Sequence, residues 1–171
     1  MATLNGIDVS ALAKYAEKAK TDAKYIQDYG NRWNARVQWL DGTRTQIYAG
    51  KHTLQSDEPE YLLGKDTAAG PTELLLAAVG SCLTVTYVAN AAAQGVKIDS
   101  LELQIDGEID MPSFLGLKKN GSSGYKSVKI KAFVKSGAPR EKLKDLLKLS
   151  VKRSPVTNTV FRGAKIIPEL S

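Results

Sequence analysis

Cysteine and histidine are almost absent from this chain, which excludes two kinds of site. Among 171 residues there is one cysteine, Cys82, and one histidine, His52. A lone cysteine cannot form a disulfide within its own chain. One thiol and one imidazole, far apart in the sequence, cannot supply the four ligands of a structural zinc site. We therefore expect no internal disulfide, no bound metal and no cofactor.

Targeting and membrane signals are also missing. The N-terminal residues lack a basic segment followed by an apolar stretch and a small-residue cleavage site. No apolar run approaches the roughly 20 residues of a membrane span. The nearest window, residues 74–94, is interrupted by polar side chains: Ser81, Thr84, Thr86, Tyr87 and Asn90. We expect a cytoplasmic protein without a membrane partner, in which this window is a buried core helix.

Composition favours one globular domain with a positive charge. Hydrophobic residues make up 43% of the chain and charged residues 25%, and the formal net charge is +6. A basic balance alone is weak evidence for nucleic-acid binding. The lysines are spread over residues 14–24, 118–135 and 142–152, where they alternate with apolar or acidic residues. This pattern indicates solvated faces of helices and strands, and no nucleic-acid partner is expected.

The first half of the chain predicts a helical extension followed by a meander. Residues 1–31 are interpreted as an N-terminal extension with a helix over 8–28, whose small apolar side chains recur at helical spacing. Asp41-Gly42 is a strong hairpin signal. Strands are predicted on either side of it and after Gly50-Lys51, over 32–40, 43–50 and 52–57. Residues 57–70 then predict a loop rich in turn residues.

The second half combines two principal helices with two long strands. A helix over 72–94 is apolar all round, which predicts burial on every side. Clean alternation predicts strands over 98–111 and 127–135, paired antiparallel and joined by a long loop. The remaining predicted elements are helices over 139–153 and 154–161 and a final strand over 164–170. The fold class is α+β: a strongly curved antiparallel sheet with two principal helices, in a domain over 32–171.

Several weaker candidate sites have simple structural explanations. His52 is expected to be exposed to solvent on a strand. The acidic loop of Asp57, Glu58 and Glu60 is interpreted as a solvated turn, with divalent-cation binding as the alternative. Five aromatic residues are expected to pack in the core or to line an apolar pocket: Trp33, Trp39, Phe114, Tyr125 and Phe161.

Cys82 has two interpretations from the residues alone. Free cysteine is a common small core residue, and its apolar helix predicts inert packing. A nucleophilic cysteine must act as the thiolate, yet the middle of a helix offers no local activation. Activation would require a donor or an arginine from elsewhere in the chain or from a partner subunit.

Two motifs resemble the osmotically induced protein C (OsmC) family, which includes the organic hydroperoxide resistance (Ohr) proteins. The motifs are GPTELLLAAVGSC at 70–82 and SPVTNTV at 154–160. The resemblance implies an intertwined homodimer with two sites at the subunit boundary. In peroxide-reducing members a thiolate on the central helix attacks the peroxide, and a second cysteine closes a disulfide. A glutamate and an arginine activate the thiolate, and external dithiols reduce the disulfide.

Carried over to this sequence, the resemblance implies a modified site. Cys82 matches the attacking thiol, and Ser154 occupies the place of the second cysteine. Glu73 stands one residue later than the catalytic glutamate of peroxidase members. At about 100° per residue, it is roughly half a turn out of phase with Cys82. Arg44 is the first candidate for the arginine, and Arg36 is the second.

These expectations lead to two hypotheses about function. In the first, the protein is a cysteine-dependent enzyme that reduces organic hydroperoxides or related electrophiles through Cys82. Because a serine cannot condense with a sulfenic acid, an external thiol would complete the cycle. In the alternative, the protein is a family member without peroxidase activity, and it binds a small apolar ligand at the dimer interface.

Overall fold

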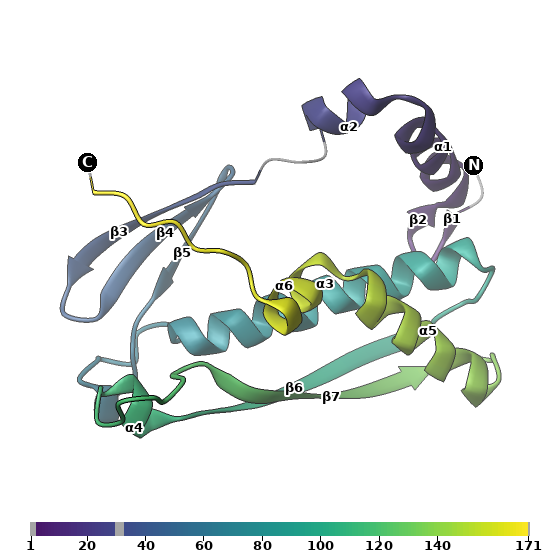
Figure 1. The fold of residues 1–171 in the computed structure, drawn as a ribbon. Coiled ribbons are helices and arrows are strands. Elements are labelled where there is room, and N and C mark those ends of the chain that lie inside the picture. Colours follow the sequence, from purple (N-terminus) through teal and green to yellow (C-terminus); the bar gives the residue numbers. More distant parts are fainter. Residues whose placement is uncertain (1–2, 30–32, 171) are drawn as a thin grey trace. The chain divides into compact units, whose positions relative to one another are not determined.

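The computed structural model describes residues 3–29 and 33–170 (Figure 1). The chain divides into two compact units. Unit 1 contains Met1–Val9 and Leu76–Ser171, and unit 2 contains Ser10–Leu75. The architecture is α+β. Among the described residues the strands form three separate antiparallel sheets, of two, three and two strands, instead of the single sheet expected from the sequence.

Unit 1 begins with a small hairpin that the sequence analysis did not predict. Strands β1 (Thr3–Leu4) and β2 (Ile7–Asp8) flank an Asn5-Gly6 turn, in which both residues have positive φ, 55° and 76°. The Asn5 amide donates to the Val96 carbonyl at 2.9 Å, and its oxygen accepts from the Ile98 N–H at 2.8 Å. One side chain therefore ties the hairpin to a distant part of the same unit.

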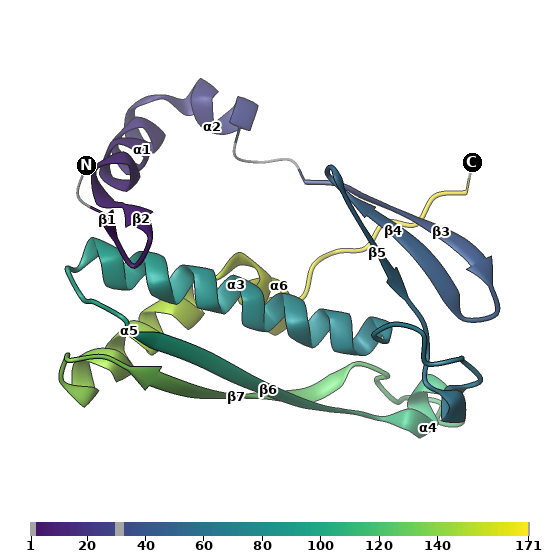
Figure 2. The ribbon, with the colours of Figure 1, turned by 180° about the vertical axis from the view of Figure 1, so that it is seen from behind.

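The main sheet of unit 1 is the predicted antiparallel pair. Strand β6 (Ser100–Ile109) pairs with β7 (Tyr125–Lys135), with Ile105 opposite Ile130. Helix α3 (Pro71–Ala93) lies along one face of this pair (Figures 1 and 2). A Cβ atom added at Gly80 would lie 3.0 Å from Cγ1 of Ile105. Glycine at this position thus allows the helix and β6 to approach closely.

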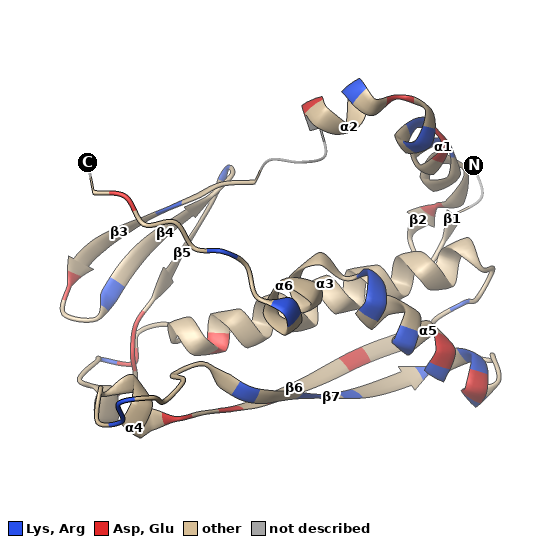
Figure 3. Ribbon diagram, in the orientation of Figure 1, with Lys and Arg blue, Asp and Glu red and all other residues tan. Residues whose placement is uncertain are grey.

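The core of unit 1 is completed by helix α5 (Arg140–Arg153). Tyr87 of α3 and Leu146 of α5 are buried together, and the Tyr87 hydroxyl donates to the Leu143 carbonyl at 3.2 Å. Lysine, arginine and acidic residues alternate along the exposed part of α5, and Figure 3 shows basic residues interspersed with acidic ones along unit 1. Helix α5 is therefore amphipathic, with Leu146 and Ser150 buried and its charged residues facing solvent.

Helix α3 is not buried on every side, contrary to the prediction. Its buried positions recur at helical spacing, on one face: Val79, Leu83, Tyr87, Asn90, Ala91 and Ala92. Val85, on another face, is 66% exposed. The helix is apolar all round, but the rest of this single chain covers only one of its faces.

Helix α3 also meets the length and composition criteria of a membrane span, although none was predicted from the sequence. Of its most apolar 18-residue window, 33% is buried inside the protein. The core helix of a soluble protein passes the same test, so length and composition alone are weak evidence.

Two further predictions about unit 1 were wrong. The predicted loop between the long strands contains a short helix, α4 (Met111–Phe114), capped by the carboxylate of Asp110. Residues 164–170 form no strand, because no neighbouring strand pairs with them. Helix α6 (Pro155–Arg162) begins directly after Ser154, as predicted.

Unit 2 contains most of the N-terminal helical region and the meander. The predicted helix is broken into α1 (Val9–Thr21) and α2 (Ala23–Tyr29), because the Asp22 carboxylate accepts the Tyr25 N–H at 2.9 Å and starts a new helix. The meander is confirmed. It consists of β3 (Ala35–Asp41), β4 (Arg44–Ala49) and β5 (His52–Ser56), in that order, followed by a 3₁₀ turn at Glu60–Leu62.

Candidate active site

The thiol of Cys82 is in contact with the hydroxyl of Ser154. Cys82 lies half-buried in the middle of α3, and Ser154 is completely buried at the start of α6. The Ser154 hydroxyl donates to the Cys82 sulfur, with 3.2 Å between Oγ and Sγ. Two residues that are 72 positions apart in the chain therefore meet in unit 1.

The hydrogen-bond pattern around Ser154 directs its proton to the sulfur. Its oxygen accepts from the Thr157 N–H at 3.3 Å and from the Thr157 hydroxyl at 2.8 Å. A serine hydroxyl has one proton to donate, and Cys82 is the acceptor. The Thr157 hydroxyl thus donates to Ser154 and the Ser154 hydroxyl donates to Cys82, so one chain of donors ends at the sulfur.

The corner between α5 and α6 holds Ser154 in place. The Ser154 N–H donates to the Ser150 carbonyl at 2.8 Å. The Asn158 amide donates to the carbonyls of Val151, Lys152 and Ser154 at 3.2, 3.0 and 2.8 Å. Asn158 thus satisfies carbonyls that the end of α5 would otherwise leave without partners. Thr157 and Asn158 were not predicted as site residues from the sequence, although both belong to the SPVTNTV motif.

An apolar cavity of about 410 Å³ adjoins this pair. Val79 lines it from α3, one turn before Cys82, and Thr157 lines it from α6. The other apolar contributions come from β7, α5 and α6: Val128, Ile130, Val151, Val160 and Phe161. An organic group placed here would lie beside the residues that position the sulfur.

The charged residues predicted to assist Cys82 have other partners within unit 2. The Arg44 guanidinium pairs with Asp41 at 3.1 Å, and Arg36 lies over the Tyr48 ring at 4.0 Å. The Glu73 carboxylate accepts the Gly70 N–H at 2.8 Å and thereby closes the start of α3. These contacts are structural, and any role of the three side chains toward the thiol remains a prediction.

Asp57 is not the solvated turn residue that the sequence predicted. It is 1% exposed, and its two oxygens accept five hydrogen bonds, from the hydroxyls of Thr43 and Thr67 and from the N–H groups of Glu58, Lys65 and Thr67. The hydrogen bond from the Thr43 hydroxyl is the largest of the causes that hold the pKa of Asp57 far below its usual range.

Within residues 3–29 and 33–170 no group of histidine, cysteine and carboxylate side chains is arranged to hold a metal.

The aromatic predictions had mixed outcomes. Trp33, Trp39 and Phe114 are 90%, 70% and 56% exposed, so in this chain they do not pack in a core. Tyr125 and Phe161 do line the apolar cavity. His52 is exposed on β5, as predicted.

Solved structures with the same fold include several proteins of one family. An OsmC-like protein from Mycoplasma pneumoniae has a TM-score of 0.68 at 17% identity, over 78% of this chain and 89% of that one. An organic hydroperoxide resistance protein from Legionella pneumophila gives 0.61 at 18%, over 78% and 91%. One from Elizabethkingia anophelis, with thiocyanate bound, gives 0.61 at 20%, over 77% and 89%. These identities establish similarity of fold.

Comparison with curated proteins finds no match. The sequence pattern of the family described as OsmC-like protein matches residues 64–169, which span the Cys82 helix, both long strands and the Ser154 corner. This match covers more than half of the chain and contains both motifs that carried the resemblance. The chain therefore belongs to the OsmC-like protein family.

Proposed function

We propose that the protein is a cysteine-dependent reductase of organic hydroperoxides that uses one cysteine and an external thiol. The hydrogen bond from the Ser154 hydroxyl to the Cys82 sulfur, at 3.2 Å, is the observation that carries the proposal. It supplies the donor that an apolar helix cannot provide by itself. Thr157 in turn donates to Ser154, so the donor is oriented before a substrate arrives.

The proposed cycle has three steps. The Cys82 thiolate attacks the terminal oxygen of the hydroperoxide, the O–O bond breaks, and the products are an alcohol and the sulfenic acid of Cys82. An external thiol then condenses with the sulfenic acid, which forms a mixed disulfide and water. A second external thiol attacks the external sulfur of the mixed disulfide. The two external thiols leave joined as one disulfide, and Cys82 returns to the reduced state.

The proposed cycle needs an external thiol because position 154 is a serine and not a second cysteine. Cys82 is the only cysteine in the sequence, so no second thiol of the chain can reach the sulfenic acid. Ser154 cannot form a disulfide, but its hydroxyl can donate to the oxidised sulfur as it does to the reduced one. This step separates the proposed cycle from that of the two-cysteine peroxidases that the resemblance implies.

The apolar cavity supports an organic substrate over hydrogen peroxide. Its volume of about 410 Å³ is within the range of small-molecule sites. Most of its lining side chains are aliphatic or aromatic, and Phe161 is mainly exposed, which leaves it available to a bound molecule. An alkyl or aryl group in this cavity would be buried, whereas hydrogen peroxide would gain nothing from it.

We also propose that the functional unit is an intertwined homodimer. The exposed apolar side of α3, which includes Leu75 and Val85, supports this assembly because a folded protein rarely leaves such a surface uncovered. The family resemblance implies two sites at the boundary between subunits. In such a dimer the charged partner of Cys82 would come from either chain.

The test is peroxidase activity with a matched variant. We expect the purified protein to consume cumene hydroperoxide with dithiothreitol or glutathione as reductant, and a sulfenic-acid trap to label Cys82. Cys82→Ser should abolish both signals. If no thiol supports consumption and the trap labels nothing, peroxidase activity is excluded.

A second candidate is binding of a small apolar molecule without peroxide chemistry. It is favoured by the pairing of Arg44 with Asp41 and of Glu73 with Gly70, which occupies the two charged side chains that were predicted to assist the thiol. Saturable binding of an apolar probe by an inactive protein would support this candidate.

A further inference from the structure

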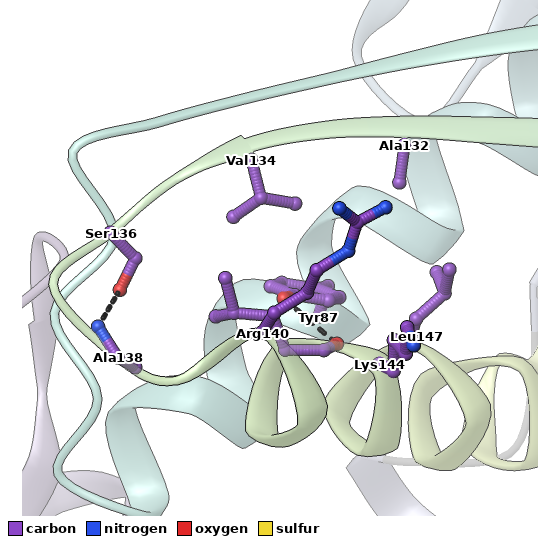
Figure 4. Close-up of a pocket in the computed structure, with 9 residues that line it drawn as sticks. Tyr87, Ala132, Val134, Ser136, Ala138, Arg140, Lys144 and Leu147 are labelled. Carbon is purple, nitrogen blue, oxygen red and sulfur yellow. Dashed lines mark hydrogen bonds between the residues drawn. The ribbon is translucent and has the colours of Figure 1, made fainter.

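A second cavity of unit 1 lies further along the same face of β7, between that strand and the first half of α5. Its volume is about 480 Å³, and its lining is displayed in Figure 4. Ala132 and Val134 contribute from β7, Leu143 and Leu147 contribute from α5, and the buried ring of Tyr87 closes the base. None of these residues lines the cavity beside Cys82.

Tyr87, which lines the second cavity, lies on a different side of α3 from Cys82. Tyr87 follows Cys82 by five residues, which corresponds to about 7.5 Å along the helix axis and about 140° around it. The Tyr87 hydroxyl is already bonded to the Leu143 carbonyl. Neither Cys82 nor Ser154 lines the second cavity.

The second cavity has positive charge and no negative charge in its lining. Arg140 and Lys144 are its only charged residues among those the structure describes. Lys144 pairs with Glu141 at 2.6 Å, whereas Arg140 makes no hydrogen bond or ion pair with any described residue. In Figure 4 the Arg140 side chain extends across the cavity toward the strand that carries Ala132 and Val134. Its guanidinium is thus placed over an apolar surface, and its nearest carboxylate, that of Glu141, is hydrogen-bonded to Lys144 and interacts with Arg140 only through space.

The start of α5 adds to the preference for an anion. Its N-cap residue, Pro139, makes no side-chain hydrogen bond to the first turn. The N–H groups of a first turn carry partial positive charge and attract anionic groups. Ser136, the other polar side chain of the cavity, is already used, since it donates to the Lys97 carbonyl and accepts from the Ala138 N–H.

We propose that this cavity binds a medium-chain organic carboxylate, with the carboxylate on Arg140 and the chain on the apolar side chains. A guanidinium matches a carboxylate through two parallel hydrogen bonds. At roughly 30 Å³ for each water-sized group, the cavity has room for about 15 non-hydrogen atoms. A chain of this size would cover Val134, Leu143 and Leu147. The proposal is independent of the peroxidase proposal, because it uses no residue of the Cys82 site.

The experiment is a calorimetric titration of the full-length protein with decanoate. We expect saturable binding, and we expect Arg140→Gln to weaken it by about tenfold or more, as loss of a charge-assisted pair does. Lys148→Gln is the matched control, since it removes the same charge from the same helix outside this cavity. It should leave the affinity unchanged. Decanol, which has a similar chain and no charge, should bind more weakly than decanoate.

Two results would overturn the proposal. One is the absence of saturable decanoate binding by the unmodified protein. The other is equal affinity for decanoate in the unmodified protein and in Arg140→Gln. The rate of Cys82 alkylation provides a separate readout, and it should be the same with and without decanoate. A peroxidase assay that fails would leave the decanoate result standing, so the two proposals can fail separately.

Discussion

The hydroxyl of Ser154 donates to the sulfur of Cys82 over 3.2 Å, at a position where the resemblance implied a second cysteine. A disulfide requires a sulfur–sulfur distance of about 2.05 Å, so a thiol in place of the hydroxyl would need only a small adjustment. We predict that Ser154→Cys forms an internal disulfide when treated with one equivalent of cumene hydroperoxide. Thiol titration and intact mass should detect the loss of both thiols and of two hydrogens.

A control distinguishes this result from general reactivity. Thr159→Cys places a thiol on the same helix, at an exposed position whose present hydroxyl bonds the Pro155 carbonyl. It should form no internal disulfide. Two free thiols in oxidised Ser154→Cys would mean that the contact is not maintained in solution.

The donor chain to the sulfur can be weakened without removing Ser154. Thr157→Val keeps the shape of the side chain but removes the hydroxyl that donates to Ser154. We expect the rate of Cys82 alkylation by iodoacetamide at neutral pH to fall by about threefold to tenfold, as loss of one net hydrogen bond does. Thr159→Val, on the same helix, should leave the rate unchanged. Equal rates in the two variants would exclude a role for the Thr157 hydroxyl.

The burial of Asp57 predicts acid sensitivity of unit 2. Because the pKa of Asp57 is lowered in the folded state, its hydrogen bonds contribute stability above the ordinary aspartate pKa of about 3.9. That contribution is complete above about pH 5 and is lost as the pH falls below about 4 toward the folded-state pKa. Urea midpoints of the unmodified protein and of Asp57→Asn should differ at pH 7 and converge in acid.

Asp66 in the same loop provides the comparison for Asp57. It is exposed and has a positive φ of 52°, which asparagine tolerates. Asp66→Asn should therefore change the urea midpoint little at any pH. A difference for Asp57→Asn that stayed constant from pH 7 to pH 2 would contradict the assignment to its ionised form.

Leu146 tests the core of unit 1. It is 1% exposed and packs with Tyr87, Ala91 and Val96. Leu146→Ala should lower the free energy of unfolding by about 2–5 kcal/mol, since it removes buried methyl groups and leaves a cavity. Chemical denaturation measures this loss, and Leu170→Ala, at a fully exposed position, is the control. A loss below 1 kcal/mol would indicate that the site collapses around the smaller side chain.

The exposed side of α3 predicts how the proposed dimer would respond to a charge. Val85 is 66% exposed in the single chain. Val85→Glu should shift sedimentation from dimer to monomer, because an unpaired carboxylate is costly to bury in an apolar interface. Val85→Ala should retain the dimer. Dimers of unchanged affinity in Val85→Glu would show that this face lies outside the interface.

Local patterns predicted most elements of the fold. The Asp41-Gly42 and Gly50-Lys51 turns lie where expected, because turn chemistry is determined by adjacent residues. The alternation in β6 and β7 matched their burial, and Ser154-Pro155 marked the start of α6. The Asn5-Gly6 hairpin was missed despite its strong turn signal, since its strands have only two residues each.

Predictions failed where a residue depends on distant parts of the chain. The strand predicted over 164–170 had no partner strand to pair with. Asp57 is buried because Thr43 and Thr67, which come from separate segments, bond its carboxylate. The contact between Cys82 and Ser154 joins two helices, so spacing alone could not reveal it. From the sequence, only the resemblance to the family indicated that Cys82 and Ser154 belong to one site.

The path of the chain between its two units limits how it can be shortened. Residues 3–9 fold with residues 76–170, and the Asn5 bonds to Val96 and Ile98 anchor them there. The segment 10–75 is therefore an insertion, entered from unit 1 and returning to it. A truncation at residue 31 would remove pieces of both units at once. Excision of 10–75, with a linker long enough to run back along α3 from residue 9 to residue 76, is the cleaner way to ask whether unit 1 folds alone.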